Sequence, residues 1–253
     1  MSTPRRIGLV VPSSNTTMET EIPELLRRHP SSRDMPVTFH SSRARLHTVD
    51  AESLARMVEE GDRCVAELGD AQIDVVAYAC LVAVMARGAG AHREVEDRLR
   101  SVLAATGSAA PVISSAGALV RTLKQLGLAR VAVITPYTPQ LTRLVVGYIE
   151  DSGIEVTESV SLSVTDNCAV GRLDPADLSG HVKSLDLTSA DGIVLSACVQ
   201  MPSLPAVQQV QDSFGLPVVT AATATAREIM LALGMTPAVP DVGAALSPGG
   251  AVL

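Results

Sequence analysis

Two cysteines stand in matching contexts in this sequence of 253 residues. The segments DVVAYACLVAVM and DGIVLSACVQMP both begin with Asp, continue through an apolar run and place Cys80 and Cys198 directly after an Ala. A cysteine thiolate is a nucleophile, and the N–H groups at the start of a following helix stabilise the thiolate and lower its pKa. No histidine lies in either segment, and the alternative is a pair of inert buried cysteines. Because the motif occurs twice, we favour a site that uses both thiols.

The other two cysteines lack a matched partner. Cys64 lies in a helical pattern and is predicted to pack in the core. Cys168 follows Asn167 and is predicted to lie near the cleft without a chemical role. The cysteines show neither C-x-x-C spacing nor neighbouring histidines, so the sequence predicts no zinc site.

The elements that surround the two motifs also occur twice, in the same order. Each set has a strand that enters a Pro-containing loop, a second strand, the cysteine strand, and a final strand, helix and glycine. The matched segments are 5–15 with 129–139, 36–46 with 154–164, 74–85 with 191–202, and 111–127 with 217–234. The sequence therefore predicts an α/β fold of two pseudo-symmetric halves, each a parallel sheet of about four strands flanked by helices.

The two halves are expected to join near Leu128. This gives an N-terminal half of residues 1–128 and a C-terminal half of residues 129–253, whose final helices can pack across onto the other half. The tail from about residue 236 is rich in Pro, Gly and Ala and is predicted to be loosely ordered.

The active site is predicted in the cleft between the halves. Parallel α/β sheets bind ligands beyond the carboxyl ends of their strands, where loops and helix N-termini converge. Cys80 and Cys198 each end an apolar strand pattern, and the loops at Asn15 and Tyr137 end the first strand of each half. Facing edges would bring all four residues to one cleft.

The composition and charge of the chain limit its possible binding partners and its cellular location. Hydrophobic residues make up 47% of the chain, with no Trp, two Phe and three Tyr, so the core must consist of Val, Leu, Ile and Ala. A net charge of −7 without a basic run argues against nucleic acid and anionic membranes as partners. The start of the chain lacks a signal-peptide core, and the longest apolar run is too short to span a bilayer. These features predict a cytoplasmic protein, with reduced thiols.

The sequence resembles the maleate cis-trans isomerases of the aspartate/glutamate racemase superfamily, from about Arg5 to Met235. The motifs that carry the resemblance are VPSSNTTMETEIP, YACLVAVM, TPY, the DN pair at Asp166 and Asn167, and SACVQMPSL. Racemases of the superfamily typically follow the first cysteine with Asn-Thr, whereas Leu81-Val82-Ala83 follows it here. Arylmalonate decarboxylases keep only one of the two cysteines, and this chain has both.

The resemblance implies roles for individual residues. Cys80 corresponds to the nucleophile and Cys198 to the partner acid, and Asn15, Tyr137 and Asn167 correspond to residues that bind the substrate carboxylates. By the helix-terminus argument, carboxylate contacts are also expected from the backbone N–H groups of Leu81, Val82, Val199 and Gln200.

The implied reaction is the conversion of maleate to fumarate. The thiolate adds to the double bond, the resulting single bond rotates, and elimination follows. The implied mechanism requires no cofactor and no metal, and the resemblance implies a place in nicotinate degradation. A homodimer or higher homo-oligomer is expected as the common state of a symmetric-looking soluble enzyme.

Alternatives remain open on the sequence alone. The nearest is a cofactor-independent racemase of an acidic amino acid or hydantoin, and a more distant one is a small-molecule receptor without turnover. Asn15 has an alternative as the cap of the helix beginning near Thr17. His47, His92 and His181 stand outside the matched motifs and are predicted to be surface histidines.

Overall fold

The computed structural model describes residues 3–46 and 48–247, and its strands form two sheets of four strands with the same order. The first sheet has the order β2-β1-β3-β4 and the second the order β6-β5-β7-β8. Every neighbouring pair is parallel. The strands are β1 (Arg5–Pro12), β2 (Val37–Ala44), β3 (Val75–Tyr78), β4 (Val112–Ser114), β5 (Arg130–Thr135), β6 (Glu155–Ser161), β7 (Gly192–Ser196) and β8 (Val218–Thr220). The predicted fold of two similar α/β halves is confirmed.

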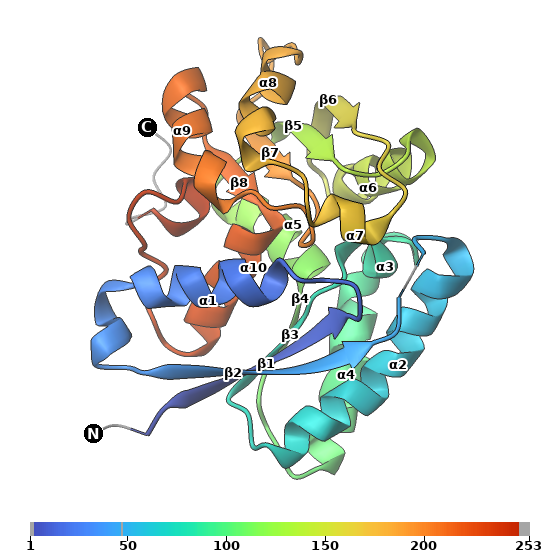
Figure 1. The fold of residues 1–253 in the computed structure, drawn as a ribbon, viewed down its shortest axis with the longest axis vertical. Coiled ribbons are helices and arrows are strands. Elements are labelled where there is room, and N and C mark those ends of the chain that lie inside the picture. Colours follow the sequence, from blue (N-terminus) through green and yellow to red (C-terminus); the bar gives the residue numbers. More distant parts are fainter. Residues whose placement is uncertain (1–2, 47, 248–253) are drawn as a thin grey trace.

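Helices flank both sheets (Figure 1). Those that follow the first sheet's strands are α1 (Met18–Arg28), α2 (Ala51–Asp70), α3 (Leu81–Met85), α4 (Ala91–Ala105) and α5 (Ser115–Gln125). Those of the second set are α6 (Pro139–Asp151), α7 (Asn167–Val170), α8 (Leu178–Lys183), α9 (Leu204–Phe214) and α10 (Ala221–Ala232). Short 3-10 turns occur at η1 (Pro30–Arg33), η2 (Pro175–Asp177) and η3 (Ala244–Leu246).

The sequence pattern explains which strands are central. β3 and β7 are buried at every position, and their residues are apolar except for Ser196 at the end of β7 and the hydroxyl of Tyr78, as expected for strands covered by helices on both faces. The edge strands β2 and β6 carry more polar residues and are partly exposed. Each cysteine strand therefore lies in the interior of its sheet, and the strands on both sides of it hold its carboxyl end in place.

Helix α10 packs across from the second set of elements onto the first. It contacts α5 and α1, and Figure 1 shows α5 and α10 in the middle of the molecule. Helix α10 is rich in small buried residues, which leave room for neighbouring elements to pack closely against its backbone. These small residues are Ala221, Ala222, Ala224 and Ala226.

The tail is ordered further than the sequence predicted. Residues 236–247 pack on the core, with Val239, Val242 and Leu246 each at most 1% exposed. Gly243 has φ 81°, and a Cβ there would lie 2.5 Å from Val207 Cγ1, so glycine lets the chain approach α9 closely. The predicted loosely ordered tail is wrong for this stretch because its few large apolar side chains insert into the core. Residues 248–253 lie outside the described residues.

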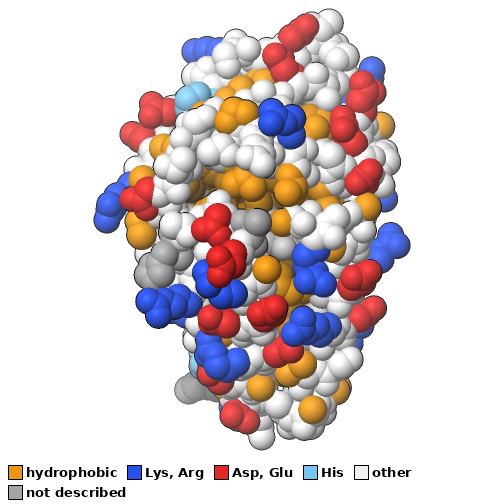
Figure 2. All heavy atoms as spheres, turned by 90° about the vertical axis from the view of Figure 1, so that its right-hand side faces the viewer, with side chains coloured by type: hydrophobic (Ala, Val, Ile, Leu, Met, Phe, Trp, Pro, Cys, Tyr) orange, Lys and Arg blue, Asp and Glu red, His pale blue; other side chains and the backbone are white. Residues whose placement is uncertain are grey.

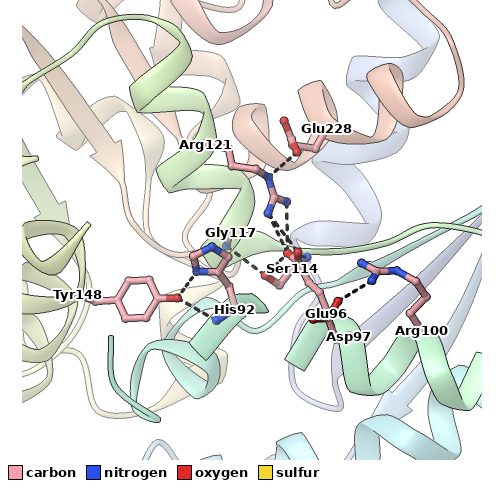
Figure 3. A network of polar contacts seen from close by, with 9 residues as sticks. All are labelled: His92, Glu96, Asp97, Arg100, Ser114, Gly117, Arg121, Tyr148 and Glu228. Carbon is pink, nitrogen blue, oxygen red and sulfur yellow. Dashed lines mark hydrogen bonds and ion pairs between the residues drawn. The ribbon is translucent and has the colours of Figure 1, made fainter. Parts of the chain in front are cut away.

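A buried polar network joins elements of the two sets (Figure 3). The ring Nδ1 of His92 on α4 lies 2.6 Å from the hydroxyl of Tyr148 on α6. Arg121 on α5 pairs with Glu96 at 3.1 Å and with Glu228 on α10 at 2.7 Å. The prediction of a surface His92 is therefore wrong, because the residue is 5% exposed and its ring has a buried partner.

The other two predicted surface histidines differ in outcome. His181 is half-buried on α8, and His47 lies outside the described residues.

Candidate active site

Cys80 and Cys198 both lie just beyond a central strand, as the repeat predicted. Cys80 follows β3 and is 4% exposed, and Cys198 follows β7 and is 5% exposed. The two thiols are close enough that a charge on Cys198 raises the pKa of Cys80. The structure thus brings the two cysteines into one buried site.

Cys80 is the residue directly before α3. Burial raises the pKa of its thiol to about 12, while a hydrogen bond from the backbone N–H of Ala83 lowers the pKa by a smaller amount. The sequence predicted a lowered pKa for this thiol, and this prediction is wrong because the pKa is raised. The reason is that a helix of five residues gives only a few aligned N–H groups, and burial in an apolar surrounding outweighs them.

Cys198 has more hydrogen-bond donors around its sulfur. Burial raises its pKa, and hydrogen bonds from the Tyr137 hydroxyl and from the backbone N–H groups of Gln200 and Met201 lower it. The Gln200 nitrogen lies 3.4 Å from the sulfur. The N–H of Gln200 was expected to contact a substrate carboxylate, but in this structure it points at Cys198.

Tyr137 lies beside both cysteines. It follows β5 and Pro136, is 5% exposed, and donates its hydroxyl hydrogen bond to Cys198. Burial and the nearby Cys198 and Cys80 sulfurs raise the pKa of Tyr137 well above its usual value, so the hydroxyl keeps its proton and remains a donor.

Asn15 is fully buried and uses its two amide ends differently. Its Oδ1 accepts from the backbone N–H groups of Thr17 and Met18, each at 3.0 Å, which is the helix-capping role considered as an alternative. Its Nδ2 reaches the Val199 carbonyl at 3.5 Å, a long contact next to the Cys198 loop. The cap therefore fixes the side chain and directs its N–H groups toward the second half.

Asn167 and Gln200 tie the loops of the two halves together. Asn167 Nδ2 donates to Ser14 Oγ at 2.6 Å. Gln200 Nε2 donates to the carbonyls of Ser14 and Asn167, both at 3.0 Å, and its Oε1 accepts from the Thr16 N–H at 3.0 Å. The side-chain amide of Gln200 thus hydrogen-bonds to backbone groups of both halves, whereas the sequence had predicted a role only for its backbone N–H.

Three of the predicted backbone donors begin helical or turn segments beside the cysteines. Leu81 and Val82 form the first turn of α3, where N–H groups have no partner within the helix. Val199 follows Cys198 directly, and all three residues are at most 4% exposed. Their N–H groups are positioned beside the two thiols.

Sequence reasoning missed the carboxylate of Glu21, which is 6% exposed. Its Oε1 accepts from the backbone N–H groups of Ser203 and Leu204, at 2.6 and 2.7 Å, at the start of α9. The available signal was its place on the apolar face of α1, three residues after Met18 and four before Leu25, where an acidic residue needs a partner.

The remaining cysteines lie apart from this chemistry. Cys64 is fully buried, and burial raises its pKa, as expected for a core position. Cys168 is exposed on α7 next to Asn167. Within residues 3–46 and 48–247, no group of three or more His, Cys, Asp or Glu side chains could hold a metal ion.

A cavity of about 400 Å³ adjoins Tyr137. Apolar side chains from α2, α6 and the loop before α7 line much of it, among them Leu54, Leu141, Leu144 and Val164. Figure 2 shows the face on this side of the molecule, where hydrophobic side chains gather in a hollow across the middle.

None of the described helices is both long and apolar enough for a membrane span.

Comparison with known proteins places this geometry in a family. The family model for arylmalonate decarboxylase matches residues 7–246. The chain is 55% identical to the maleate isomerase of Geobacillus stearothermophilus over 243 residues, which covers 96% of this chain and 97% of that protein.

Solved structures agree. The maleate isomerase Iso from Pseudomonas putida S16, solved as a cysteine-to-alanine variant with maleate, has 47% identity and a TM-score of 0.95, covering 98% of this chain and 99% of that one. A cysteine-to-serine mutant of the Nocardia farcinica maleate cis-trans isomerase, with a covalently bound succinylcysteine intermediate, has 48% identity and a TM-score of 0.93, covering 96% and 98%. The chain therefore belongs to the maleate isomerases and to the family that the arylmalonate decarboxylase model describes.

Proposed function

We propose that this protein converts maleate to fumarate by cysteine addition, bond rotation and elimination. The observation that carries the proposal is the pair of buried thiols, Cys80 and Cys198, in a chain 55% identical to a maleate isomerase. A succinylcysteine intermediate in a relative supports covalent chemistry at a cysteine. The racemase alternative is not favoured, because four relatives with 48–55% identity are maleate isomerases.

In the proposed first step, the Cys80 thiol, which its pKa of about 12 keeps protonated in the fold, gives its proton to water, and the thiolate adds to one alkene carbon of maleate. The π electrons move to the other carbon and its carboxylate, and the Cys198 thiol gives its proton to that carbon. The result is a succinyl group on Cys80 and a thiolate on Cys198. The former double bond is now a single bond and rotates.

Elimination reverses these steps. The Cys198 thiolate removes a proton from the carbon that it protonated, the C–S bond breaks, and fumarate leaves with Cys80 again a thiolate. Protons and electrons balance over the cycle, so no further reactant is required. The donors around Cys198 suit this role, because Tyr137, Gln200 and Met201 all stabilise its thiolate form.

Neutral donors hold the two carboxylates in this scheme. Asn15 and Asn167 supply amide N–H groups, and Tyr137 supplies a hydroxyl that stays protonated. The N–H groups of Leu81, Val82 and Val199 complete the set, and we assign Gln200 a role through its side chain and through Cys198 rather than by a direct carboxylate contact. Charge that grows on a carboxylate during addition is stabilised by such fixed dipoles.

Proton NMR of maleate mixed with the reduced protein tests the proposal. The vinyl signal of fumarate is expected with the unmodified chain and with Cys168→Ser, a control at an exposed cysteine, and no signal is expected with Cys80→Ser. Persistence of maleate with folded, reduced protein would rule the isomerase out. Fumarate formation by Cys80→Ser at the unmodified rate would remove Cys80 from the mechanism.

We also propose the setting in which the enzyme works. It would act as a homodimer or higher homo-oligomer in the cytoplasm, where thiols stay reduced, during nicotinate degradation. Residues 1–128 and 129–253 would be its two halves. Light scattering of the purified protein tests the oligomer, and a monomeric mass at working concentration would contradict it.

A further inference from the structure

The loop that follows Cys198 is held at its far end by the other half of the molecule. Residues 197–203 connect β7 to α9, and Ser203 precedes the helix without capping it through its own side chain. The two N–H groups at this end, of Ser203 and Leu204, instead donate to Glu21 Oε1 at 2.6 and 2.7 Å. Glu21 lies on α1, so one half supplies the helix cap of the other.

The surroundings of Glu21 strengthen its contact with the start of α9. The residue is buried, and Ser203 Oγ adds a third contact to its Oε2 at 3.3 Å. Burial raises the pKa of Glu21, and the hydrogen bonds from Leu204 and Ser203 lower it. An acidic side chain at a helix N-terminus also interacts favourably with the helix dipole.

The middle of the same loop is anchored to the first half as well. The Thr17 hydroxyl donates to the Gln200 carbonyl at 2.7 Å, and the Gln200 side chain binds the backbone at Ser14 and Thr16. These contacts and those of Glu21 come from one continuous stretch, residues 14–21. That stretch therefore determines where the loop, and the thiol at its start, lie relative to the half that carries Cys80.

We propose that Glu21 is a positioning residue for Cys198, holding the loop so that the Cys198 thiol faces the carbon opposite the one that Cys80 attacks. This inference rests on the proposed isomerisation. The contacts of Glu21 are with Ser203 and Leu204 at the start of α9. It acts by fixing the end of the segment that contains Gln200 and Met201, whose N–H groups contact the Cys198 sulfur.

Two variants separate position from charge. Glu21→Ala removes the acceptor, whereas Glu21→Gln keeps an oxygen that can accept both N–H bonds but loses the negative charge. Glu24→Gln is the matched control, because Glu24 lies on the same helix and pairs with Arg27 and Arg28 at the surface.

Turnover is measured first, by NMR, on variants shown to be folded by circular dichroism. Glu21→Ala should lower kcat by about 100-fold, the cost of a misplaced catalytic group, with KM changed by less than about threefold. Glu21→Gln should recover most of the lost kcat, and Glu24→Gln should match the unmodified enzyme. Mass spectrometry should find more succinyl adduct on Glu21→Ala during turnover, because a misplaced Cys198 slows elimination.

A second measurement needs no turnover and decides the matter if Glu21→Ala does not fold. In a Cys80→Ser, Cys168→Ser background, iodoacetamide labelling of Cys198 is followed against pH by peptide mass spectrometry. A third variant, Glu21→Asp, keeps the carboxylate on a shorter side chain that cannot hold both N–H groups at their present distances, so Cys198 should be labelled faster at every pH, whereas Glu21→Gln and Glu24→Gln should keep the background rate.

The outcomes distinguish this inference from the function on which it rests. The inference is overturned if folded Glu21→Ala keeps kcat within about threefold of the unmodified enzyme, well inside the loss expected of a misplaced group. Where Glu21→Ala does not fold, labelling of Cys198 in Glu21→Asp at the same rate as in Glu24→Gln overturns it. Failure of the unmodified enzyme to convert maleate would instead refute the proposed function.

Discussion

The two cysteine sites occupy the same position in their sheets but are supported in different ways. After β3, the chain passes from Cys80 directly into α3, and the donor to its sulfur, Ala83, comes from the same short segment. After β7, a loop separates Cys198 from α9, and Tyr137 and the stretch 14–21 hold that loop. The repeated strands place a thiol at the same position in each sheet. The different segments that follow the strands give the two thiols different hydrogen-bond donors.

This difference matches the roles that we propose. Cys198 alternates between thiol and thiolate, and its three donors stabilise the charged form when the proton has left. Cys80 has fewer donors and a pKa of about 12, so its thiolate is a strong nucleophile once formed. One fold thus gives two buried cysteines with different sets of hydrogen-bond donors.

The largest expected effect comes from replacing the nucleophile. Cys80→Ser should lower kcat by at least about 10⁴-fold, since the removal of an enzyme nucleophile has losses of this order or greater. The matched change in the other half, Cys198→Ser, should be milder. Equal residual rates in the two variants, measured by NMR, would contradict the proposed division of roles.

Loss of the proton donor should give the next largest effect. Cys198→Ser should slow turnover by about 10²–10⁴-fold, the usual range for a general acid or base. The adduct should still form and should persist, because elimination needs the same group. A time course of intact mass after addition of maleate checks this, and free protein throughout would count against a role in elimination.

Removal of the Tyr137 hydroxyl should affect the second site more than the first. Tyr137→Phe should reduce kcat by about 10²-fold, the cost of one preorganised donor. Because the hydroxyl lowers the pKa of Cys198, the variant should shift iodoacetamide labelling of Cys198 to higher pH. An unshifted labelling profile would show that Tyr137 does not stabilise that thiolate.

Alkaline pH should lower the free energy of unfolding, because Cys80 is buried as a neutral thiol. Its pKa is about 12 in the fold against 9.0 as its ordinary value, so the unfolded chain ionises first as pH rises. The stabilising contribution is complete below pH 9.0 and is lost as pH rises toward 12. Urea denaturation should show the free energy of unfolding of the unmodified chain falling faster than that of Cys80→Ala, by up to about 1.4 kcal/mol per pH unit. Parallel curves would indicate a thiol that is already ionised or exposed.

The smallest effect is expected at the unmatched surface cysteine. Cys168 is exposed on α7, and its backbone N–H donates to the Asp166 carboxylate at 2.8 Å. Cys168→Ser should leave kcat within about twofold, as surface changes away from a site usually do. A larger loss would mean that a third thiol takes part.

Much of this arrangement could be predicted from the sequence because it depends on local patterns that occur twice. The apolar runs before Cys80 and Cys198 identify central strands, and parallel strands place their carboxyl ends at one edge. Motif resemblance then indicated Asn15, Tyr137 and Asn167, and the structure brings all three close to the cysteine loops.

The features that the sequence did not predict depend on contacts between distant parts of the chain, and a local sequence pattern does not contain those contacts. The bond between His92 and Tyr148 joins two helices from different halves, and Glu21 caps a helix that begins 183 residues later in the chain. The raised pKa of Cys80 follows from burial by many elements rather than from its own helix. Order in residues 236–247 likewise arises from where Val239 and Leu246 insert, which their Pro- and Gly-rich surroundings concealed.

The most direct test of the central claim is to locate the covalent adduct. Cys198→Ser protein is mixed with maleate, digested and analysed by tandem mass spectrometry, with Cys80→Ser treated alongside. We expect a succinyl group on Cys80 in the first protein and none on any cysteine of the second. A succinyl group on Cys198 in the Cys80→Ser protein, or an unmodified Cys80 in a Cys198→Ser protein that still forms fumarate, would contradict the proposed mechanism.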